Sequence, residues 1–172
     1  LQPRQHCAAL DAGTGALLPW APDLSYLGNL GQVRDLLVSG DSLFVAGEFD
    51  VVDGQARGNL AAFDIASGQL TGWNPDANGT VSSMIELNGT VYLSGYFYEL
   101  GGIARQRLGA VDRITGEVES WNPQCSGNVN SLAAAGGLIY AGGWFATMGG
   151  DAHQNIAAID AESGQVEDWS PE

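Results

Sequence analysis

Four aspartates recur in one short pattern, D-x-x-[ST]-G, at Asp11, Asp64, Asp112 and Asp160. Carboxylates of this kind can coordinate a metal ion or transfer protons. An Asp before Ser or Thr and Gly is also typical of a tight turn, in which the carboxylate accepts backbone N–H groups. A residue that recurs once in every repeat is spread along the molecule and does not converge on one site. We therefore predict turn caps here, and no metal site or cofactor.

Two other residue types with useful chemistry recur in the same way. A basic residue falls at Arg57, Arg105 and His153, and we expect it to pair with a carboxylate or a carbonyl group between repeats. Tryptophan is the second type, and its indole ring can serve as a platform for sugars or as packing between layers. Strict repetition favours packing for Trp20, Trp73, Trp121 and Trp169.

The sequence lacks the motifs of common enzymes. It has no G-x-S-x-G, H-E-x-x-H, P-loop or C-x-x-C pattern. The D-V-V-D-G segment at 50–54 lacks the alternating oxygen ligands of a calcium loop. The two histidines, His6 and His153, fall two positions apart in their units and form no obvious pair. We therefore predict no catalytic residues, and a protein that is not an enzyme.

The spacing of these residues reveals an internal repeat. Trp73, Trp121 and Trp169 follow one another at intervals of 48 residues, without insertion or deletion. The second half of one more unit opens the chain, at an offset of 53 residues from the next copy. The five additional residues lie between Pro22 and Val33, so the loop around Tyr26 is longer than its counterparts.

Each unit reads as four short strands. In the first complete unit they are expected at 33–38, 43–49, 59–64 and 69–73, with Gly, Asn, Asp and Ser between them. The Asn88–Gly89 pair predicts a two-residue hairpin turn. No sustained period of 3.6 residues is present, so helices should be scarce.

Four strands in 48 residues predict an all-β fold made of antiparallel β-propeller blades, because this is the size of a propeller repeat. We expect a half blade at 1–22 and complete blades at 33–75, 81–123 and 129–171. Three and a half blades do not close a ring, so we expect the segment to belong to a larger propeller or to associate with other subunits.

The repeat resembles the delta-60 repeat family of β-propellers. The likeness rests on a glycine-rich strand, an Arg, an L-A-A-x-D strand and a Trp-Asn-Pro ending: Gly142, Gly143, Phe145, Arg57, Arg105, Leu60, Ala61, Ala62, Asp64, Thr115, Gly116, Trp121, Asn122 and Pro123. The glycine-rich strand is also similar to kelch blades, whereas the ending is not. His153 in place of Arg, and Ser after Trp169, depart from the pattern. The resemblance implies a secreted or surface-attached protein and no single activity.

Charge excludes some partners. The chain has 20 acidic residues against six arginines and no lysine, for a net charge of −14. Nucleic acid and anionic membrane surfaces would both repel it. No run of about 18 apolar residues is present, so we predict no membrane insertion. The chain has two cysteines, Cys7 and Cys125. They could form one disulfide with each other, remain free thiols, or form disulfides with other segments.

A binding face is expected where the repeats differ from one another. The loop between the second and third strands is the longest in each unit, and its sequence diverges. With the loop around Tyr26, it should present an acidic and aromatic surface, which fits a cation, a glycan or a protein partner, or else is simply solvated. The residues of this predicted face are Tyr26, Asp50, Asp53, Tyr98, Glu99, Arg107, Met148 and Asp151.

Two glycosylation sequons lie at predicted turns, at Asn78 and Asn88. With the regular repeat and the missing catalytic motifs, they favour a non-catalytic extracellular or cell-surface scaffold or protein-interaction module. The alternative is a glycan-binding or ligand-binding propeller, which includes a carbohydrate-active one, and its site would be the variable loops.

Overall fold

The computed structural model describes residues 7–169, and within them every regular element is a β-strand. Each complete blade is an antiparallel sheet of three strands. These are β3 (Gln32–Ser39), β4 (Ser42–Glu48) and β7 (Leu60–Asp64) in blade 1, β8 (Val81–Leu87), β9 (Thr90–Gly95) and β12 (Leu108–Asp112) in blade 2, and β13 (Asn128–Ala135), β14 (Leu138–Trp144) and β17 (Ile156–Asp160) in blade 3. Positions 1–6, 170 and 171 of the expected blades lie outside the described residues.

The predicted fourth strand is much shorter than expected. At 69–73 only one residue bridges to its neighbour, in the pair Phe63↔Leu70, and the same bridge recurs as Leu10↔Leu17, Val111↔Val118 and Ile159↔Val166. Two backbone hydrogen bonds flank the bridge in blade 1, from Asp64 N to Gln69 O and from Thr71 N to Ala62 O. The Pro after each Trp has no N–H to continue such a ladder, so the outer strand of the blade ends early.

The long loop of each blade folds into a small hairpin. These hairpins are β5 (Val51–Val52) with β6 (Gln55–Ala56), β10 (Glu99–Leu100) with β11 (Ile103–Ala104), and β15 (Thr147–Met148) with β16 (Asp151–Ala152). Each hairpin also pairs with the linker that enters its blade, through Leu24↔Val52, Ala77↔Leu100 and Cys125↔Met148. The linker is therefore attached to the blade that follows it.

The insertion around Tyr26 forms an additional hairpin. β1 (Leu24–Tyr26) and β2 (Asn29–Leu30) pair with each other, and β1 also pairs with β5. Leu27 and Gly28 at the tip both have positive φ. The five inserted residues thus extend the blade 1 hairpin to a four-stranded sheet in the order β2-β1-β5-β6.

A bulge recurs where the innermost strand of each blade meets the second. The register shifts between Val33 and Asp35, between Val81 and Ser83, and between Val129 and Ser131. The residue opposite each bulge is a repeated glycine, at Gly47, Gly95 and Gly143. A side chain there would overlap the backbone of the innermost strand. Glycine is therefore required at this position because the two strands approach too closely for a Cβ atom, and not because the backbone turns there.

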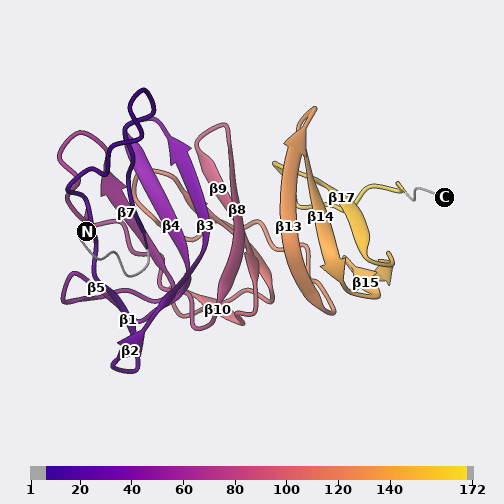
Figure 1. Cartoon of the computed structure of the whole chain (residues 1–172). Coiled ribbons are helices and arrows are strands. Elements are labelled where there is room, and N and C mark those ends of the chain that lie inside the picture. The colour runs from indigo at the N-terminus through magenta and orange to yellow at the C-terminus, as the bar shows by residue number, and fades with distance from the viewer. Residues whose placement is uncertain (1–6, 170–172) are drawn as a thin grey trace.

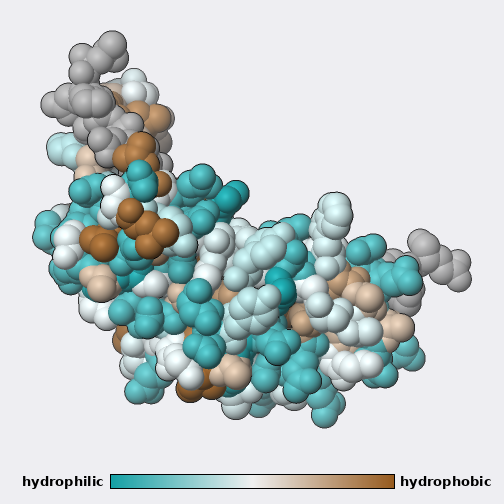
Figure 2. Space-filling view, turned by 90° about the horizontal axis from the view of Figure 1, so that it is seen from below, coloured by the Kyte–Doolittle hydropathy of each residue, from teal (hydrophilic) through white to brown (hydrophobic). Residues whose placement is uncertain are grey.

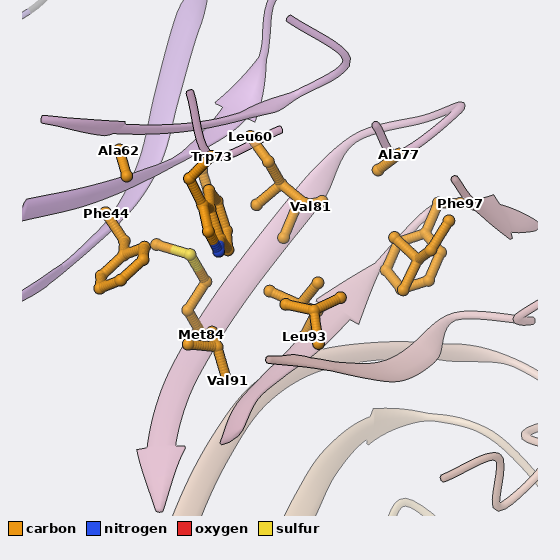
Figure 3. Close-up of a cluster of buried hydrophobic side chains, with 13 residues drawn as sticks. Phe44, Leu60, Ala62, Trp73, Ala77, Val81, Met84, Val91, Leu93 and Phe97 are labelled. Carbon is orange, nitrogen blue, oxygen red and sulfur yellow. The ribbon is translucent and has the colours of Figure 1, made fainter. Parts of the chain in front are cut away.

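Hydrophobic packing lies between the units. One cluster joins blades 1 and 2, a second joins blades 2 and 3, and a third joins the half blade to blade 1. Alternate residues of β4 face opposite ways, since Phe44 packs toward blade 2 and Val45 toward the half blade. Figure 3 shows the first cluster, in which Trp73 lies beside Phe44 and Met84. A blade buries each face only against a neighbour.

The blades fan out from their innermost strands. β8 lies between β3 and β13, with blade 1 on one side and blade 3 on the other (Figure 1). In the half blade the described residues form only the bridge Leu10↔Leu17, and no described strand covers Leu36 of β3, which is 51% exposed. An apolar cleft of about 710 Å³ lies there, lined by residues such as Trp20, Leu36, Leu43 and Phe63.

Candidate functional site

The repeated aspartates cap their turns. Asp64 Oδ1 accepts hydrogen bonds from Ser67 N at 2.7 Å and from Ser67 Oγ at 2.5 Å. Asp112 Oδ1 accepts from Thr115 N at 2.6 Å, and Asp11 and Asp160 make the same contacts in their own turns. Among the described residues, no group of three or more His, Cys, Asp or Glu is arranged to hold a metal ion.

These hydrogen bonds predict that acid weakens the blades. The Ser67 hydroxyl and N–H hold the pKa of Asp64 below its ordinary value, and the pKa values of Asp11, Asp112 and Asp160 are lowered likewise. A carboxyl whose pKa is depressed by folding contributes stability above its unfolded pKa of about 3.9, and the contribution disappears as the pH falls through the folded value. We expect the urea midpoint to fall between about pH 5 and pH 2.

The measurement is urea unfolding across that pH range for the wild type and for Asp64→Asn. Asparagine keeps an acceptor oxygen but does not titrate, so the variant should lose part of the pH dependence. Asp151→Asn is the matched control, because Asp151 is exposed and no hydrogen bond joins its side chain to another described residue. An unchanged pH profile in Asp64→Asn would contradict the assignment.

The repeated arginines act within their own blades, not between blades. Arg57 donates from Nη2 to Thr71 O at 2.8 Å, and Arg105 donates from Nη2 to Glu119 O at 2.6 Å. Each guanidinium thereby links the long loop to the outer strand of its own blade. His153 holds the equivalent position in blade 3, and its imidazole makes no such bond within the described residues.

The repeated tryptophans join successive blades. Trp73 and Trp121 are buried, and each ring packs edge-on against an aromatic ring of its own blade, Phe44 or Tyr92. Their indole nitrogens donate across to the next blade, to Asp112 O at 3.2 Å and to Asp160 O at 3.0 Å. Each Trp therefore lies on the capped turn of the following blade.

The predicted binding face lies at the lower end of the molecule in Figure 1, where the hairpins project. Figure 2 looks onto this end and shows a mostly hydrophilic surface, with hydrophobic residues gathered toward the side of the half blade. Leu27 and Leu30 of the additional hairpin are 73% and 64% exposed. Glu99 and Asp151 are exposed at the blade 2 and blade 3 hairpins.

Two carboxylates of the predicted face hold the inserted loop by accepting hydrogen bonds from its backbone. Asp50 accepts a hydrogen bond from Leu27 N at 3.0 Å, and Asp53 accepts one from Asp23 N at 2.8 Å. Tyr26 lies in β1, opposite Asn29. These contacts hold the inserted loop against the blade 1 hairpin. The second carboxylate oxygen of Asp50 is buried without a partner in the described chain.

Met148 was wrongly assigned to the exposed face. Its side chain is fully buried in the cluster between blades 2 and 3. The reason is the bridge Cys125↔Met148, which turns the first hairpin strand toward the linker and the core. Val52 and Leu100 hold the same position in the other blades and are also fully buried.

Among the described residues of this face, one group combines charge with exposed aromatic rings, and Arg107 is its centre. Its guanidinium lies 5.0 Å from the ring centroid of Tyr98 and 5.7 Å from that of Tyr96. Arg107 Nη2 donates to Tyr98 Oη at 2.8 Å, and Nη1 donates to Asn128 Oδ1. Tyr96 and Tyr98 are each about half exposed, at 52% and 54%.

Trp144 extends this group onto blade 3. Its side chain is 78% exposed, and it lies opposite Asn128 in the ladder between β13 and β14. Directly opposed residues project to the same face of an antiparallel pair, so the indole stands beside the amide that binds Arg107. We call Tyr96, Tyr98, Arg107, Asn128 and Trp144 the aromatic–arginine surface. Sequence reasoning missed Tyr96, Asn128 and Trp144.

Backbone geometry marks Arg107 as a departure from the repeat. Asn59, Arg107 and Asn155 hold equivalent positions and all have positive φ, at 63°, 69° and 68°. Asparagine tolerates this region, whereas arginine is uncommon in it. The side chain of Asn59 makes two buried hydrogen bonds to the backbone: it accepts one from Phe49 N and donates one to Ala77 O. In blade 2, Arg107 takes the place of this asparagine, and its guanidinium bonds to Tyr98 and Asn128 instead.

Both sequon asparagines are exposed. Asn78 Oδ1 accepts hydrogen bonds from Tyr98 N at 2.9 Å and Glu99 N at 3.0 Å, which holds the start of the β10 hairpin. Asn88 and Gly89 form the predicted two-residue turn between β8 and β9, and both have positive φ.

The two cysteines do not form a disulfide with each other. Cys125 is buried, donates from Sγ to Gly127 O at 3.1 Å, and lies in the cluster between blades 2 and 3. Burial raises the pKa of both thiols. Among the residues described, no helix is long and apolar enough to cross a membrane.

Comparison with known proteins bears on the family and the fold. The model of the family described as "Outer membrane protein assembly factor BamB" (PQQ_2) matches residues 3–171. No curated protein matches the chain in sequence. The crystal structure of the computationally designed Ika4 protein is similar, with a TM-score of 0.56 and 17% identity over 84% of this chain and 76% of that one.

The crystal structure of the computationally designed Ika8 protein is also similar, with a TM-score of 0.53 and 16% identity over 92% of this chain. The chain spans about half the length of Ika8, 54% of it. At these identities the likeness concerns the fold alone, and it agrees with an all-β assembly of propeller-type blades. The family match supports a repeat family of this type without singling out the delta-60 repeats.

Proposed function

This chain belongs to the family described as outer membrane protein assembly factor BamB, a β-propeller-type repeat family, and from that we propose a non-catalytic module that binds a protein partner through the aromatic–arginine surface. The observation that carries the proposal is the placement of Arg107 between two half-exposed tyrosines, next to Asn128. Tyr, Trp and Arg are the residues enriched in the binding hot spots of protein interfaces.

Charge supports the choice of Arg107 as the anchor. The chain carries a net charge of −14, yet this surface presents a guanidinium held in place by Tyr98 and Asn128. A fixed guanidinium pairs well with a carboxylate, and the flanking rings offer apolar contact. The partner we propose therefore presents an acidic side chain or a C-terminal carboxylate among apolar groups.

The test is capture of partners from the natural source by the immobilised wild type and by Arg107→Asn. Asparagine is the residue that the repeat itself uses at this position, so the variant should fold at least as well as the wild type. We expect the partner to bind about tenfold more weakly or to be lost. Ile114→Ala is the matched control, because it removes an exposed apolar side chain (69% exposed) from the opposite end of blade 2. Equal capture by Arg107→Asn and the wild type would contradict the proposal.

A second candidate function, glycan binding, is favoured by Trp144. An indole that is 78% exposed beside an amide and a guanidinium offers a sugar ring both a stacking platform and hydrogen-bond donors. A glycan array with the wild type and Trp144→Ala separates the two candidates. Binding that disappears in Trp144→Ala supports a glycan site, and an empty array leaves the protein partner as the function.

The proposal includes an extracellular or cell-surface location and blades of the delta-60 type. The exposed sequons at Asn78 and Asn88 support the first, and the Trp-Asn-Pro endings support the second. The intact mass of the protein from its natural source tests the location, because hexose-sized increments at either Asn require passage through a secretory pathway. A bare polypeptide mass would speak against that part of the proposal.

A further inference from the structure

A polar cavity of about 400 Å³ lies between blades 2 and 3, at the end of the blades opposite the hairpins. This volume is within the range of small-ligand pockets, about 300–1,000 Å³. The residues that line the cavity include Thr90, Tyr92 and Glu119 of blade 2 and Asp160, Ala161 and Glu162 of blade 3. Three of these six carry a carboxylate, and none of the described residues that line the cavity is basic.

The junction between blades 1 and 2 shows what the repeat places in the same position. There the guanidinium of Arg113 covers Gly40, because a Cβ on Gly40 would lie 2.9 Å from Arg113 Nη1. Forty-eight residues further along the chain, these two positions are Ala161 and Asn88, and both line the cavity. The backbone is alike at the two junctions, since Arg113 and Ala161 each donate an N–H to the inner hairpin turn of their own blade. The cavity therefore lies where an arginine side chain fills the preceding junction.

Two carboxylates appear at the junction from which this arginine is absent. Glu119 stands where blade 1 has Thr71, and Glu162 stands where blade 2 has Ile114. Glu119 Oε1 accepts a hydrogen bond from Thr90 Oγ1 at 3.0 Å, and no described residue donates to its second oxygen. Glu162 is exposed at the rim. A hollow that loses a cation and gains two anions attracts a positively charged group.

Tyr92 adds a polar atom to the wall of the cavity. Its hydroxyl donates to Ala161 O at 2.7 Å, whereas Phe44 has no hydroxyl at the equivalent position of blade 1. Burial, and after it the Glu119 carboxylate, raises the pKa of Tyr92, so the phenol keeps its proton. The wall is thus polar, and the hydroxyl bond joins blade 2 to blade 3 beside the carboxylates.

We infer that the cavity between blades 2 and 3 binds a guanidinium group, in the place that Arg113 fills at the preceding junction. A guanidinium presents several N–H donors in one plane and can pair with both Glu119 and Glu162. The ligand is a small guanidino compound or an arginine side chain of another polypeptide. The inference is independent of the proposed partner surface, because none of the cavity residues belongs to the aromatic–arginine surface.

The test is a titration with N-acetyl-arginine amide, followed in backbone amide NMR spectra. Protein made in a bacterial host is used, so that Asn88 at the cavity carries no glycan. We expect saturable shifts at Thr90, Glu119 and Ala161, with a dissociation constant of about 1 mM or below. N-acetyl-citrulline amide has a neutral urea in place of the guanidinium, and it should bind about tenfold more weakly or not at all.

Two variants locate the site. Glu119→Gln keeps the shape of the side chain and removes its charge, so it should weaken binding about tenfold. Ala161→Arg supplies the arginine of the preceding junction and should abolish binding. Glu117→Gln is the matched control, because it removes an exposed carboxylate outside the cavity, and it should bind like the wild type. Thermal unfolding establishes that the variants fold, and Glu119→Gln decides alone if Ala161→Arg does not.

A pentapeptide with a central arginine, Gly-Gly-Arg-Gly-Gly, separates the two sources of the guanidinium. Tighter binding of the peptide than of the amide assigns the cavity to an arginine of another protein, and weaker binding assigns it to a free guanidino compound. The absence of a saturable shift with either probe up to about 10 mM would overturn the inference. Equal affinity for the arginine and citrulline amides, or unchanged binding in Glu119→Gln, would overturn it as well.

Discussion

Replacing Trp121 by alanine is expected to lower the free energy of unfolding by about 3–5 kcal/mol, the usual cost of deleting a buried Trp ring. The ring is 3% exposed and lies between Tyr92 of its own blade and Ile159 of the next. Its loss also removes the bond from the indole nitrogen to Asp160 O. For a chain of this length, such a change lowers Tm by about 10 °C or more, which denaturant and thermal unfolding can measure.

Trp144→Ala is the control for that prediction. Its side chain is 78% exposed and belongs to none of the three hydrophobic clusters, so the change should be within about 0.5 kcal/mol. Trp121→Phe keeps most of the packing and removes the indole N–H donor. Its loss of unfolding free energy should therefore lie between those of Trp121→Ala and Trp144→Ala. If Trp121→Ala and Trp144→Ala cost the same, Trp121 does not join the blades as described.

Gly95→Ala is expected to destabilise the protein by about 3 kcal/mol or more, although it adds only a methyl group. A Cβ at this position would overlap the Thr80 carbonyl oxygen and lie 2.9 Å from Val81 Cα. Both neighbours are backbone atoms, one just before β8 and one at its first residue beside the bulge, so no side chain can rotate away. The chain must instead shift β8, whose Val81 and Met84 lie in the cluster that joins blades 1 and 2.

Gly72→Ala is the matched control, because a Cβ there would meet nothing within 4 Å and the residue is exposed. We expect its free energy of unfolding to equal that of the wild type or to be slightly higher, since Ala restricts the unfolded chain. Denaturant unfolding of both variants makes the comparison. A Gly95→Ala variant as stable as Gly72→Ala would show that the bulge relaxes freely.

The period of 48 residues was enough to predict the fold class and the first three strands of each blade. Expected strands at 33–38, 43–49 and 59–64 agree with β3, β4 and β7 to within one residue, because alternation and turn residues mark both ends of each strand. The fourth strand was overestimated. The residue types at 69–73 favour an extended backbone. Strand length, however, depends on pairing with β7, and only Leu70 forms a bridge to it.

The binding face was harder to predict for a physical reason. Whether a loop residue is buried depends on long-range pairing, and the bridge Cys125↔Met148 has no signature in either segment alone. Asp50 and Asp53 were read as surface ligands, whereas they accept backbone N–H groups from a loop more than twenty residues away. The repeat did contain one usable signal, which is Arg107 at a position where the other two blades have Asn.

The attachment of each linker to the blade that follows it has a mechanical consequence. Tension applied along the chain at the linker before blade 2 or blade 3 meets the Ala77↔Leu100 or Cys125↔Met148 bridge before it reaches the sheet itself. The linker bridge and the Trp on the next turn both cross the same junction, so they share the load. The chain should therefore extend in discrete steps of one blade, each releasing about 160 Å of contour length. A chain of such repeats would therefore lengthen by one blade at a time under tension, while the blades that remain folded continue to bear the force.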